Sequence, residues 1–450
     1  MSPSFLRHIP PMAAESLNPA DTVWVLLATG LVLLMTPGLA FFYGGLVRAK
    51  NTLNTMMMSF AALGVVGVAW ALVGYSIAFG GDGAWFGGAQ HLFLQGVTLQ
   101  SEGGIPQLLF MMFQGTFAII TAALISGALV ERMRFVPFVT FMVVWMLLIY
   151  APVAHWVWGG GWLAELGALD FAGGAVVHVN AGIAAVVAAM VLGPRKDFAR
   201  QAILPHNVPF VLLGTALLWF GWLGFNGGSA LGANRAAVLA VVNTILAPAA
   251  ASVVWMALDH LRERRVTAVG IATSIVVGLV AVTPAAGFVG PSGAMAIGAL
   301  AALPSYGALL LKSRLKLDDS LDVAAAHGLG GLVGAILTGV FAETGWGEVN
   351  GALFGNVAQL WPQALSVLAV IAYSGAGSWL ILKALGAVMH LRADAKHEGV
   401  GLDVTEHGEE AYAQGEGAVL LLPDTPASRP QAESKNRVPL GKQTLHGGQS

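Results

Sequence analysis

The chain contains eleven apolar segments that are each long enough to span a lipid bilayer, whose hydrocarbon core is about 30 Å thick. They cover residues 22–47, 54–79, 106–130, 136–154, 171–193, 207–226, 236–258, 267–285, 292–311, 322–342 and 363–389. Only 10% of the residues are charged, whereas soluble domains carry about 25%. The sequence therefore predicts an all-α integral membrane protein with eleven transmembrane helices. The segments outside these helices are too short to form an enzyme domain.

Basic residues are concentrated in every second loop between these segments. The loops after the first, third, fifth, seventh and ninth segments carry Arg48 and Lys50; Arg132 and Arg134; Arg195, Lys196 and Arg200; Arg262, Arg264 and Arg265; and Lys312, Arg314 and Lys316. The intervening loops carry Arg235 alone. Because loops rich in Lys and Arg stay in the cytoplasm, we expect a multi-pass protein of the cytoplasmic membrane with its N-terminus outside and its C-terminus inside.

Four regions follow from this pattern. Residues 1–21 form an extracytoplasmic tail in which Asp21 is expected to cap the first helix. Residues 22–390 form the transmembrane domain, residues 391–422 an ordered cytoplasmic segment, and residues 423–450 a disordered tail rich in Pro, Gln, Ser and Gly. The chain has no cysteine, which excludes disulfides, thioether-bound haem and zinc–thiolate sites.

Two segments share an arrangement of an aspartate followed by a histidine. Asp170 begins the fifth segment and precedes His178 by eight residues, and Asp322 begins the tenth and precedes His327 by five. Each aspartate is expected to cap the start of its own helix. These segments run in opposite directions, so each histidine approaches the middle of the bilayer from its own side. We therefore predict a five-plus-five inverted repeat followed by a final helix, with a site near the midplane.

The two histidines and Asp170 each admit a structural and a functional interpretation. Intramembrane histidines either fix helix packing through hydrogen bonds or mark a functional site. Two at mirrored positions favour the functional interpretation. A metal site is the weaker alternative, because no third ligand is evident and zinc takes at least three protein ligands. Asp170 is expected to cap its helix through the amides of Gly173 and Gly174, with an electrostatic effect on a cation as its second role.

Aromatic residues gather near the outer ends of several segments: Phe113, Phe117, Trp158, Trp222 and Phe225, with the hydroxyl of Ser229 close by. They fit an interfacial aromatic belt. They also fit a cation–π site for a small cation, with Ser229 accepting a hydrogen bond. The residues alone leave both interpretations open.

Over residues 18–415, the chain resembles the ammonium transporter family (Amt/Mep/Rh), in particular its bacterial Amt branch. The resemblance rests on motifs that occur in the same order: FFYGGLVRAKN, FQGTF, ALVERMRF, HWVWGGGWL, DFAGGAVVHVNAG, GWLGFNGGSA, TPAAGFVG, DVAAAHGLGG and GLDVTEHGEEAY. Alanines precede His327 where Amt members usually carry bulkier residues, so the packing of the pore is expected to differ there.

The resemblance implies a role for each candidate residue. Substrate-binding residues at an outer ammonium site are Phe113, Phe117, Trp158 and Ser229. The rings that close the pore are Phe117 and Phe225, the pore histidines are His178 and His327, and the supporting carboxylates are Asp170 and Asp322. No metal and no cofactor is implied.

The resemblance also implies ammonium uptake by a homotrimer, each subunit with its own pore. Ammonium would be recruited outside, deprotonated and passed as ammonia along the histidines, with proton relay through the pair. The predicted partner is the cytoplasmic PII signal protein. One alternative is an ammonium sensor with little flux, and another is an Rh-like or other small-cation channel. The outer Trp158 and Ser229 favour the Amt branch.

Overall fold

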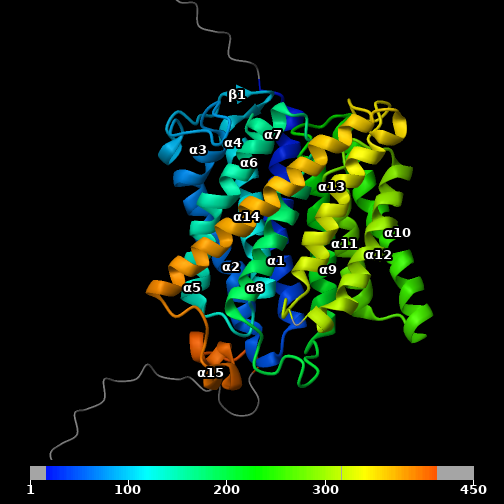
Figure 1. Ribbon diagram of the computed structural model, residues 1–450. Helices are drawn as coiled ribbons and strands as arrows, with labels where there is room; N and C mark the ends of the chain where they lie inside the picture. The colour runs from blue at the N-terminus through cyan, green and yellow to red at the C-terminus, as the bar shows by residue number, and fades with distance from the viewer. Residues whose placement is uncertain (1–16, 316, 413–450) are drawn as a thin grey trace, which may run out of the picture.

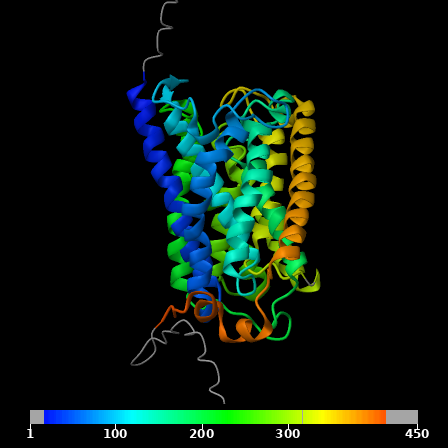
Figure 2. The same cartoon turned by 90° about the vertical axis from the view of Figure 1, so that its left-hand side faces the viewer.

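Helices cover all eleven predicted segments. In the computed structural model, which describes residues 17–315 and 317–412, ten helices are long and apolar enough to cross a membrane. The eleventh segment coincides with a shorter apolar helix, α11 (Ala268–Val282). The helices form one bundle (Figures 1 and 2). The tail predicted at 423–450, and most of the one predicted at 1–21, lie outside the described residues.

The first half of the bundle contains α1 (Pro19–Leu46), α2 (Thr52–Ala69), α3 (Tyr75–Phe79), α4 (Gln107–Leu124), α5 (Phe135–Trp145), α6 (Ala151–Trp158), α7 (Trp162–Glu165) and α8 (Asn180–Leu192). The second half contains α9 (Val208–Gly228), α10 (Arg235–Glu263), α11, α12 (Pro291–Leu315), α13 (Gly330–Phe341), α14 (Leu360–Val388) and the short α15 (Ala395–Val400). Strands β1 (Ser101–Glu102) and β2 (Ile105–Pro106) form a small hairpin in the outer loop.

Several helices are extended by turns of different pitch. The 3-10 turns are η1 (Ala49–Asn51), η3 (Leu92–Leu94), η4 (Ile125–Ala128), η8 (Ala352–Phe354) and η9 (Val357–Gln359). The π-helical turns are η2 (Trp70–Gly74), η5 (Met146–Tyr150), η6 (Gly174–Val179), η7 (Ala324–Leu329) and η10 (Asp403–His407). Because π-helical turns are rare and often mark functional sites, η6 and η7, which hold the two histidines, are of particular interest.

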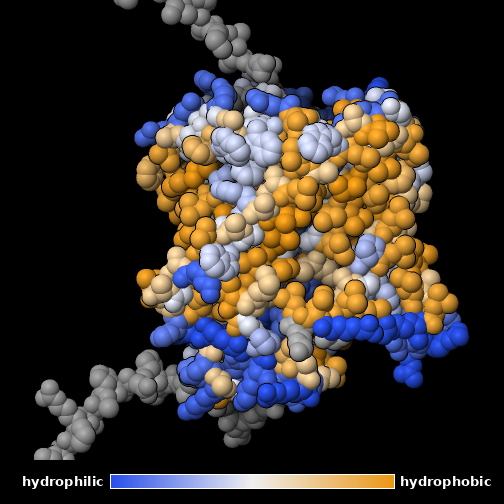
Figure 3. All heavy atoms as spheres, viewed as in Figure 1, coloured by the Kyte–Doolittle hydropathy of each residue, from blue (hydrophilic) through white to orange (hydrophobic). Residues whose placement is uncertain are grey.

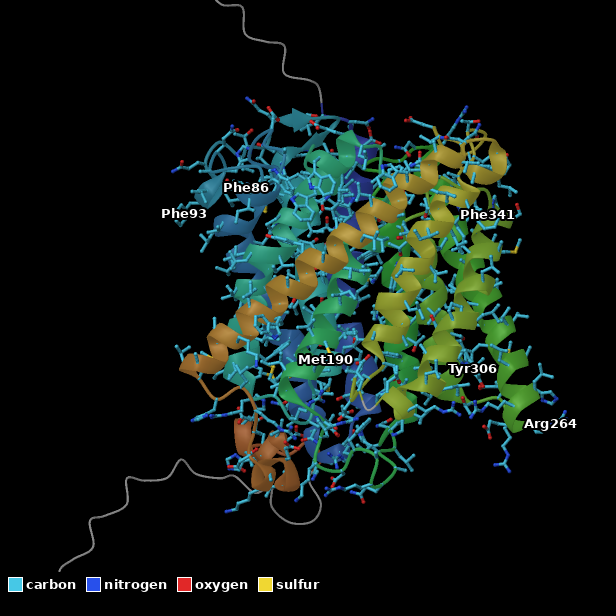
Figure 4. All side chains as sticks on the ribbon, viewed as in Figure 1. Phe86, Phe93, Met190, Arg264, Tyr306 and Phe341 are labelled. Atoms are coloured by element: carbon cyan, nitrogen blue, oxygen red, sulfur yellow. The ribbon has the colours of Figure 1, made fainter. Side chains whose placement is uncertain are left out.

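An apolar band crosses the face of the bundle seen in Figure 3, and polar side chains lie at both ends of that face. Arg264, in one of the basic loops, lies at the same end of the bundle as α15 (Figure 4). This distribution is that of a protein immersed in a bilayer, because charged side chains are costly in the hydrocarbon core. The chain is a multi-pass membrane protein.

The packing follows the predicted inverted repeat. The first helix of each half packs against the other, α1 on α9, and the last helices of the two halves cross, with α8 against η7 and α13 against η6. At this crossing Gly182 faces the backbone of Gly328, and a Cβ added at Gly331 would meet the Cβ of His178 at 2.9 Å. Small residues let membrane helices approach closely, so these glycines set how near the two histidines lie.

The first helix begins earlier than expected. Asn18, rather than Asp21, is its N-cap, and its side-chain oxygen accepts hydrogen bonds from the amides of Ala20 and Asp21. Asp21 instead accepts a hydrogen bond from the amide of Ala233. The prediction for Asp21 is therefore wrong, because Pro19 opens the helix at a position where its missing N–H costs nothing.

The described part of the C-terminal segment packs against the inner ends of two helices. Asp403 accepts hydrogen bonds from the amides of Leu53 and Asn54 at the start of α2, at 3.0 and 2.8 Å. Glu406 accepts one from the amide of Phe135 at the start of α5, at 3.0 Å. Carboxylates are favourable partners for helix N-termini. These two interactions hold the described part of the segment against α2 and α5.

Buried charges link four inner loops. Glu131 is fully buried and pairs with Arg195 at 2.8 Å and with Arg48 at 3.0 Å. Arg195 also pairs with Asp318 at 2.8 Å. Burial raises the pKa of Glu131, but the two arginines outweigh it, so the net pKa is lowered. The carboxylate therefore stays ionised and paired.

Replacing Glu131 with glutamine is expected to destabilise the protein by about 3–5 kcal/mol, because it leaves the two arginines without their buried partner. Unfolding in detergent, followed by tryptophan fluorescence, measures this. The matched control is Glu263→Gln, whose ion pair with Arg262 is exposed and is expected to contribute about 1 kcal/mol or less. Equal losses in the two variants would contradict the structural role of the buried network.

Candidate functional site

The carboxylate of Asp170 caps the helical turn that carries His178. One oxygen accepts hydrogen bonds from the amides of Gly173 and Gly174 at 2.8 and 2.6 Å, and the other from Ala175 and Val176 at 2.8 and 3.1 Å. These are the otherwise unpaired donors of a helix start. The predicted cap on Gly173 and Gly174 is thus confirmed. Because both oxygens have two partners, Asp170 has no free lone pair with which to act as a base.

On the inner side, Asp319 caps the helical turn that carries His327. Asp319 accepts a hydrogen bond from the amide of Ala324 at 2.7 Å, at the start of η7. Asp322, which was expected to cap this helix, instead binds Lys312 at 2.6 Å. That expectation is wrong, because the chain turns through a positive φ of 63° at Asp322 before the helix begins. Asp319 precedes His327 by eight residues, the same spacing as in the fifth segment.

His178 and His327 are stacked side by side in the centre of the bundle. Their Nδ1 atoms lie 3.2 Å apart and their ring planes meet at 24°. Both side chains are buried, and Nε2 of His178 has no hydrogen-bond partner in the described residues. A hydrogen bond between two Nδ1 atoms needs one donor and one acceptor, so the neutral rings must carry opposite tautomers.

Towards the outside, aromatic rings cover the histidines. Phe117 and Phe225 lie 4.2 Å apart between ring centroids, and the Phe225 ring lies 6.1 Å from that of His178. Phe113 meets Phe117 edge-on at 5.0 Å. These phenylalanines are buried. They separate the histidines from the outer surface.

Above this pair lie the two remaining outer-site candidates, Trp158 and Ser229, which are both partly exposed. The Trp158 ring meets that of Phe117 edge-on at 6.0 Å, and its Nε1 donates to the carbonyl of Asp170 at 2.9 Å. The Ser229 hydroxyl donates to the carbonyl of Phe225 at 2.8 Å, which leaves its oxygen lone pairs available. The structure therefore brings Trp158, Phe117 and Phe113 together, and Ser229 lies one turn beyond Phe225 on the same helix.

Trp222 differs from its expected place in an outer aromatic pair. Its ring stacks on His178 at 5.4 Å, below Phe225, and its Nε1 donates to the hydroxyl of Thr283 at 2.8 Å. It faces the pore because α9 turns by about 100° per residue, which places residues 222 and 225 on one face that looks inwards.

A narrow cavity lies beside the histidines, with room for about one water-sized molecule. It is lined by Met35, Leu39, Phe42, Ile120, Leu124, Val177, His178, Leu218, Trp222, Phe225, Val276 and His327. The two imidazoles and the indole are its polar groups, and all other side chains are apolar. Such a space favours neutral molecules over ions, because burial is costly for a charge.

The described residues contain no group of three or more His, Asp or Glu side chains placed to hold a metal ion. Sequence reasoning missed one residue of the site, Asp319, and placed another, Trp222, at the outer site rather than beside His178. The spacing of eight residues before His327 was a signal for Asp319. The signal for Trp222 was its place on the same helix face as Phe225.

Comparison with known proteins gives a consistent result. Residues 23–412 match the model of the Ammonium Transporter Family. An ammonium transporter of Aquifex aeolicus is 50% identical over 401 residues, covering 88% of this chain and 94% of the relative. One of Bacillus subtilis is 45% identical over 398 residues, covering 87% and 98%.

Solved structures agree with these relatives. The crystal structure of Saccharomyces cerevisiae Mep2 superposes with a TM-score of 0.80 at 35% identity, covering 85% of this chain and 89% of that one. A structure described as a sensor Amt protein gives a TM-score of 0.80 at 32% identity, covering 86% and 98%. These similarities extend over nearly all of the described residues.

Proposed function

The chain belongs to the ammonium transporter family, and from this premise we propose that it takes up ammonium by binding the cation at the outer aromatic site and passing ammonia through the histidine-lined cavity. The observation that carries this proposal is the pair of Phe117 and Phe225. It lies between a partly exposed group of aromatic and hydroxyl side chains and a buried, mostly apolar cavity. The family to which the chain belongs consists of transporters and is not a class of enzymes.

Recognition of ammonium follows from the groups above Phe117. Ammonium must lose water to enter, and a cation close to the rings of Trp158 and Phe117 gains about 2 kcal/mol or more when desolvated. Ser229 accepts one hydrogen bond from the ion. Potassium has no hydrogen to donate, so this contact favours ammonium. The four amides that bind Asp170 stabilise its negative charge, which adds a favourable field at the cation site.

Passage below the rings requires the neutral molecule. The deprotonated species, ammonia, moves past His178 and His327, whose ring nitrogens supply hydrogen bonds in an otherwise apolar cavity. The two imidazoles remain uncharged, because a cavity without a buried carboxylate partner offers no compensation for a charge.

The proton takes a separate path through the imidazole pair. A proton released from ammonium binds Nε2 of His178, the proton on its Nδ1 moves to Nδ1 of His327, and Nε2 of His327 gives up its own proton on the inner side. One proton enters and one leaves, so the pair is uncharged afterwards. The transfers leave each ring in the other tautomer, so a further proton follows the same path only after both tautomers are reset by a route other than reversal of these transfers. Ammonia and a proton together carry one positive charge across the membrane.

Uptake by the purified protein tests the function. We expect proteoliposomes to accumulate labelled methylammonium, with inhibition by ammonium chloride and little inhibition by potassium chloride at the same concentration. Protein-free liposomes are the control. A failure to accumulate label above that control would contradict the proposal.

A second candidate function is ammonium sensing with little flux. The similarity to a sensor Amt protein favours it. The same experiment separates the two, because a sensor binds methylammonium without accumulating it.

The proposal also covers the location of the protein, its oligomeric state and its partner. We place residues 22–390 as the transport domain in the cytoplasmic membrane, with the segment from 391 inside. We propose a homotrimer, and the trimeric PII signal protein as a partner of the inner face. The described part of the C-terminal segment supports a PII surface, because it is held against α2 and α5 by Asp403 and Glu406. Pull-down of PII by the full chain, and its loss on truncation at Gly399, is the expected outcome.

A further inference from the structure

A groove lies at the outer end of the bundle, where α10, α12 and the loop after α13 meet (Figure 1). Its volume is about 440 Å³, within the range of about 300–1,000 Å³ that is common for ligand pockets. Pro291 of α12, Gly345 and Trp346 of the loop, and four residues of α10 line it. It shares no lining residue with the cavity beside the histidines. The proposed transport mechanism therefore leaves this groove without a role.

The part of the groove that points towards the middle of the membrane is apolar. Val238, Leu239 and Val242 follow Arg235 by three, four and seven residues, so they share one face of α10. At a rise of about 1.5 Å per residue, this face extends about 10 Å along the helix from Arg235. One half of the hydrocarbon core is about 15 Å thick. The groove therefore has the polarity and the length to hold part of an acyl chain.

The outer end of the groove carries an unpaired cation. The side chain of Arg235 is exposed and forms no ion pair or hydrogen bond with the described residues. The preference for cytoplasmic Lys and Arg accounts for the inner loops but not for Arg235, which is the only Lys or Arg in the loops of the outer side. The planar guanidinium carries N–H donors that match the oxygens of a phosphate. Arg235 is therefore available to bind an anionic group at the membrane surface.

Trp346 adds a second donor to the rim of the groove. Its side chain is 52% exposed, and its indole N–H has no hydrogen-bond acceptor among the described residues. A Cβ added at Gly290 would lie 2.5 Å from Nε1 of Trp346, so the indole rests directly on the backbone before α12. Tryptophan is enriched at the interface between membrane and water, where its ring is at the level of the lipid head groups. Trp346 therefore indicates that the rim of the groove lies at this level.

We infer that the groove binds one glycerophospholipid of the outer leaflet, with its phosphate on Arg235 and one acyl chain along Val238 and Val242. A phospholipid combines the two properties that the groove requires, because it has an anionic phosphate at one end and a hydrocarbon chain at the other. A free phosphate ion would leave the apolar face uncovered, and an uncharged lipid would leave Arg235 unpaired. The site goes beyond the proposed transport function and does not depend on it.

Lipid binding by the full chain tests the head-group end of the site. The protein is purified in detergent and titrated with dioleoyl phosphatidylglycerol, and bound lipids are counted by native mass spectrometry. We expect one lipid per chain to bind more tightly than all others. Arg235→Gln is expected to raise its dissociation constant about tenfold, because hydrogen bonds to the charged phosphate are lost. The control is Arg265→Gln, which removes an exposed charge just beyond the inner end of α10 and is expected to leave this constant unchanged.

A second pair of variants tests the apolar end. Val238→Trp fills the groove and is expected to weaken binding of the same lipid about tenfold, which corresponds to about two methylene groups that lose their contacts. Val253→Trp is the matched control, because Val253 lies on the same helix outside the groove and is 62% exposed, against 67% for Val238. Unchanged lipid binding in both Arg235→Gln and Val238→Trp would overturn the site. Dissociation of the oligomer in Val238→Trp with unchanged lipid binding would overturn it too, and would show that a second copy of this chain covers the groove.

Discussion

Asp170→Asn is expected to reduce methylammonium uptake by about 100-fold or more. The asparagine side chain offers one acceptor oxygen, and its amide NH₂ group faces two of the backbone amides that Asp170 now binds. Hydrogen bonds to charged groups contribute about 1.5–3 kcal/mol each, so the loss of two is worth roughly 3 kcal/mol or more. A difference of that size corresponds to a factor of about 100.

Two effects of Asp170→Asn both lower the rate of uptake. The turn that presents His178 loses its cap, and the outer cation site loses a negative charge nearby. Initial uptake by proteoliposomes at matched protein content measures the sum. The control is Asp21→Asn, which changes a carboxylate on the outer face that accepts a hydrogen bond from the amide of Ala233 in a loop. A folded Asp170→Asn protein that retained more than about a tenth of the wild-type rate would contradict the assigned role.

His178→Ala is expected to abolish the electrical current that accompanies ammonium uptake. The substitution removes one half of the Nδ1–Nδ1 hydrogen bond and leaves Nδ1 of His327 without a partner in an apolar cavity. A proton then has no continuous path between the two sides. We expect the current to fall below a tenth of the wild-type value, equivalent to about 1.4 kcal/mol or more in the barrier for the proton.

Current on an ammonium step, recorded from proteoliposomes on a supported membrane, measures this effect. The control is His260→Ala, at an exposed position near the inner end of α10. An undiminished current in His178→Ala would show that the proton does not travel through the pair. Uptake of label without current in the wild-type protein would show that ammonia alone crosses.

The membrane architecture was predictable because long apolar segments leave few alternatives. Each predicted segment coincides with a helix to within several residues, since in lipid the backbone must satisfy its own hydrogen bonds. The mirrored histidines were found for the same reason, because an ionisable residue in such a segment is rare. Their distance was not predictable. It depends on the close approach of Gly182 and Gly328, and sequence reasoning does not tell which glycines of two helices face each other.

The inner aspartates show where sequence reasoning failed. Asp318, Asp319 and Asp322 all precede His327, and helix capping was assigned to the one nearest the apolar segment. In the structure, Asp319 caps the helix while Asp318 binds Arg195 and Asp322 binds Lys312. Arg195 comes from a loop that is distant in sequence, whereas Lys312 lies on the preceding helix, α12. Only the tertiary structure decides which carboxylate remains for the helix.

The most direct test of the proposed mechanism is the current carried by the wild-type protein in an ion-substitution series. Ammonium, methylammonium, potassium and sodium are applied in turn at equal concentration to the same proteoliposomes. The proposal predicts a current with ammonium, a smaller one with methylammonium, and none above protein-free liposomes with potassium or sodium. A potassium current as large as the ammonium current would contradict recognition by Trp158, Phe117 and Ser229 and would indicate a different small-cation channel.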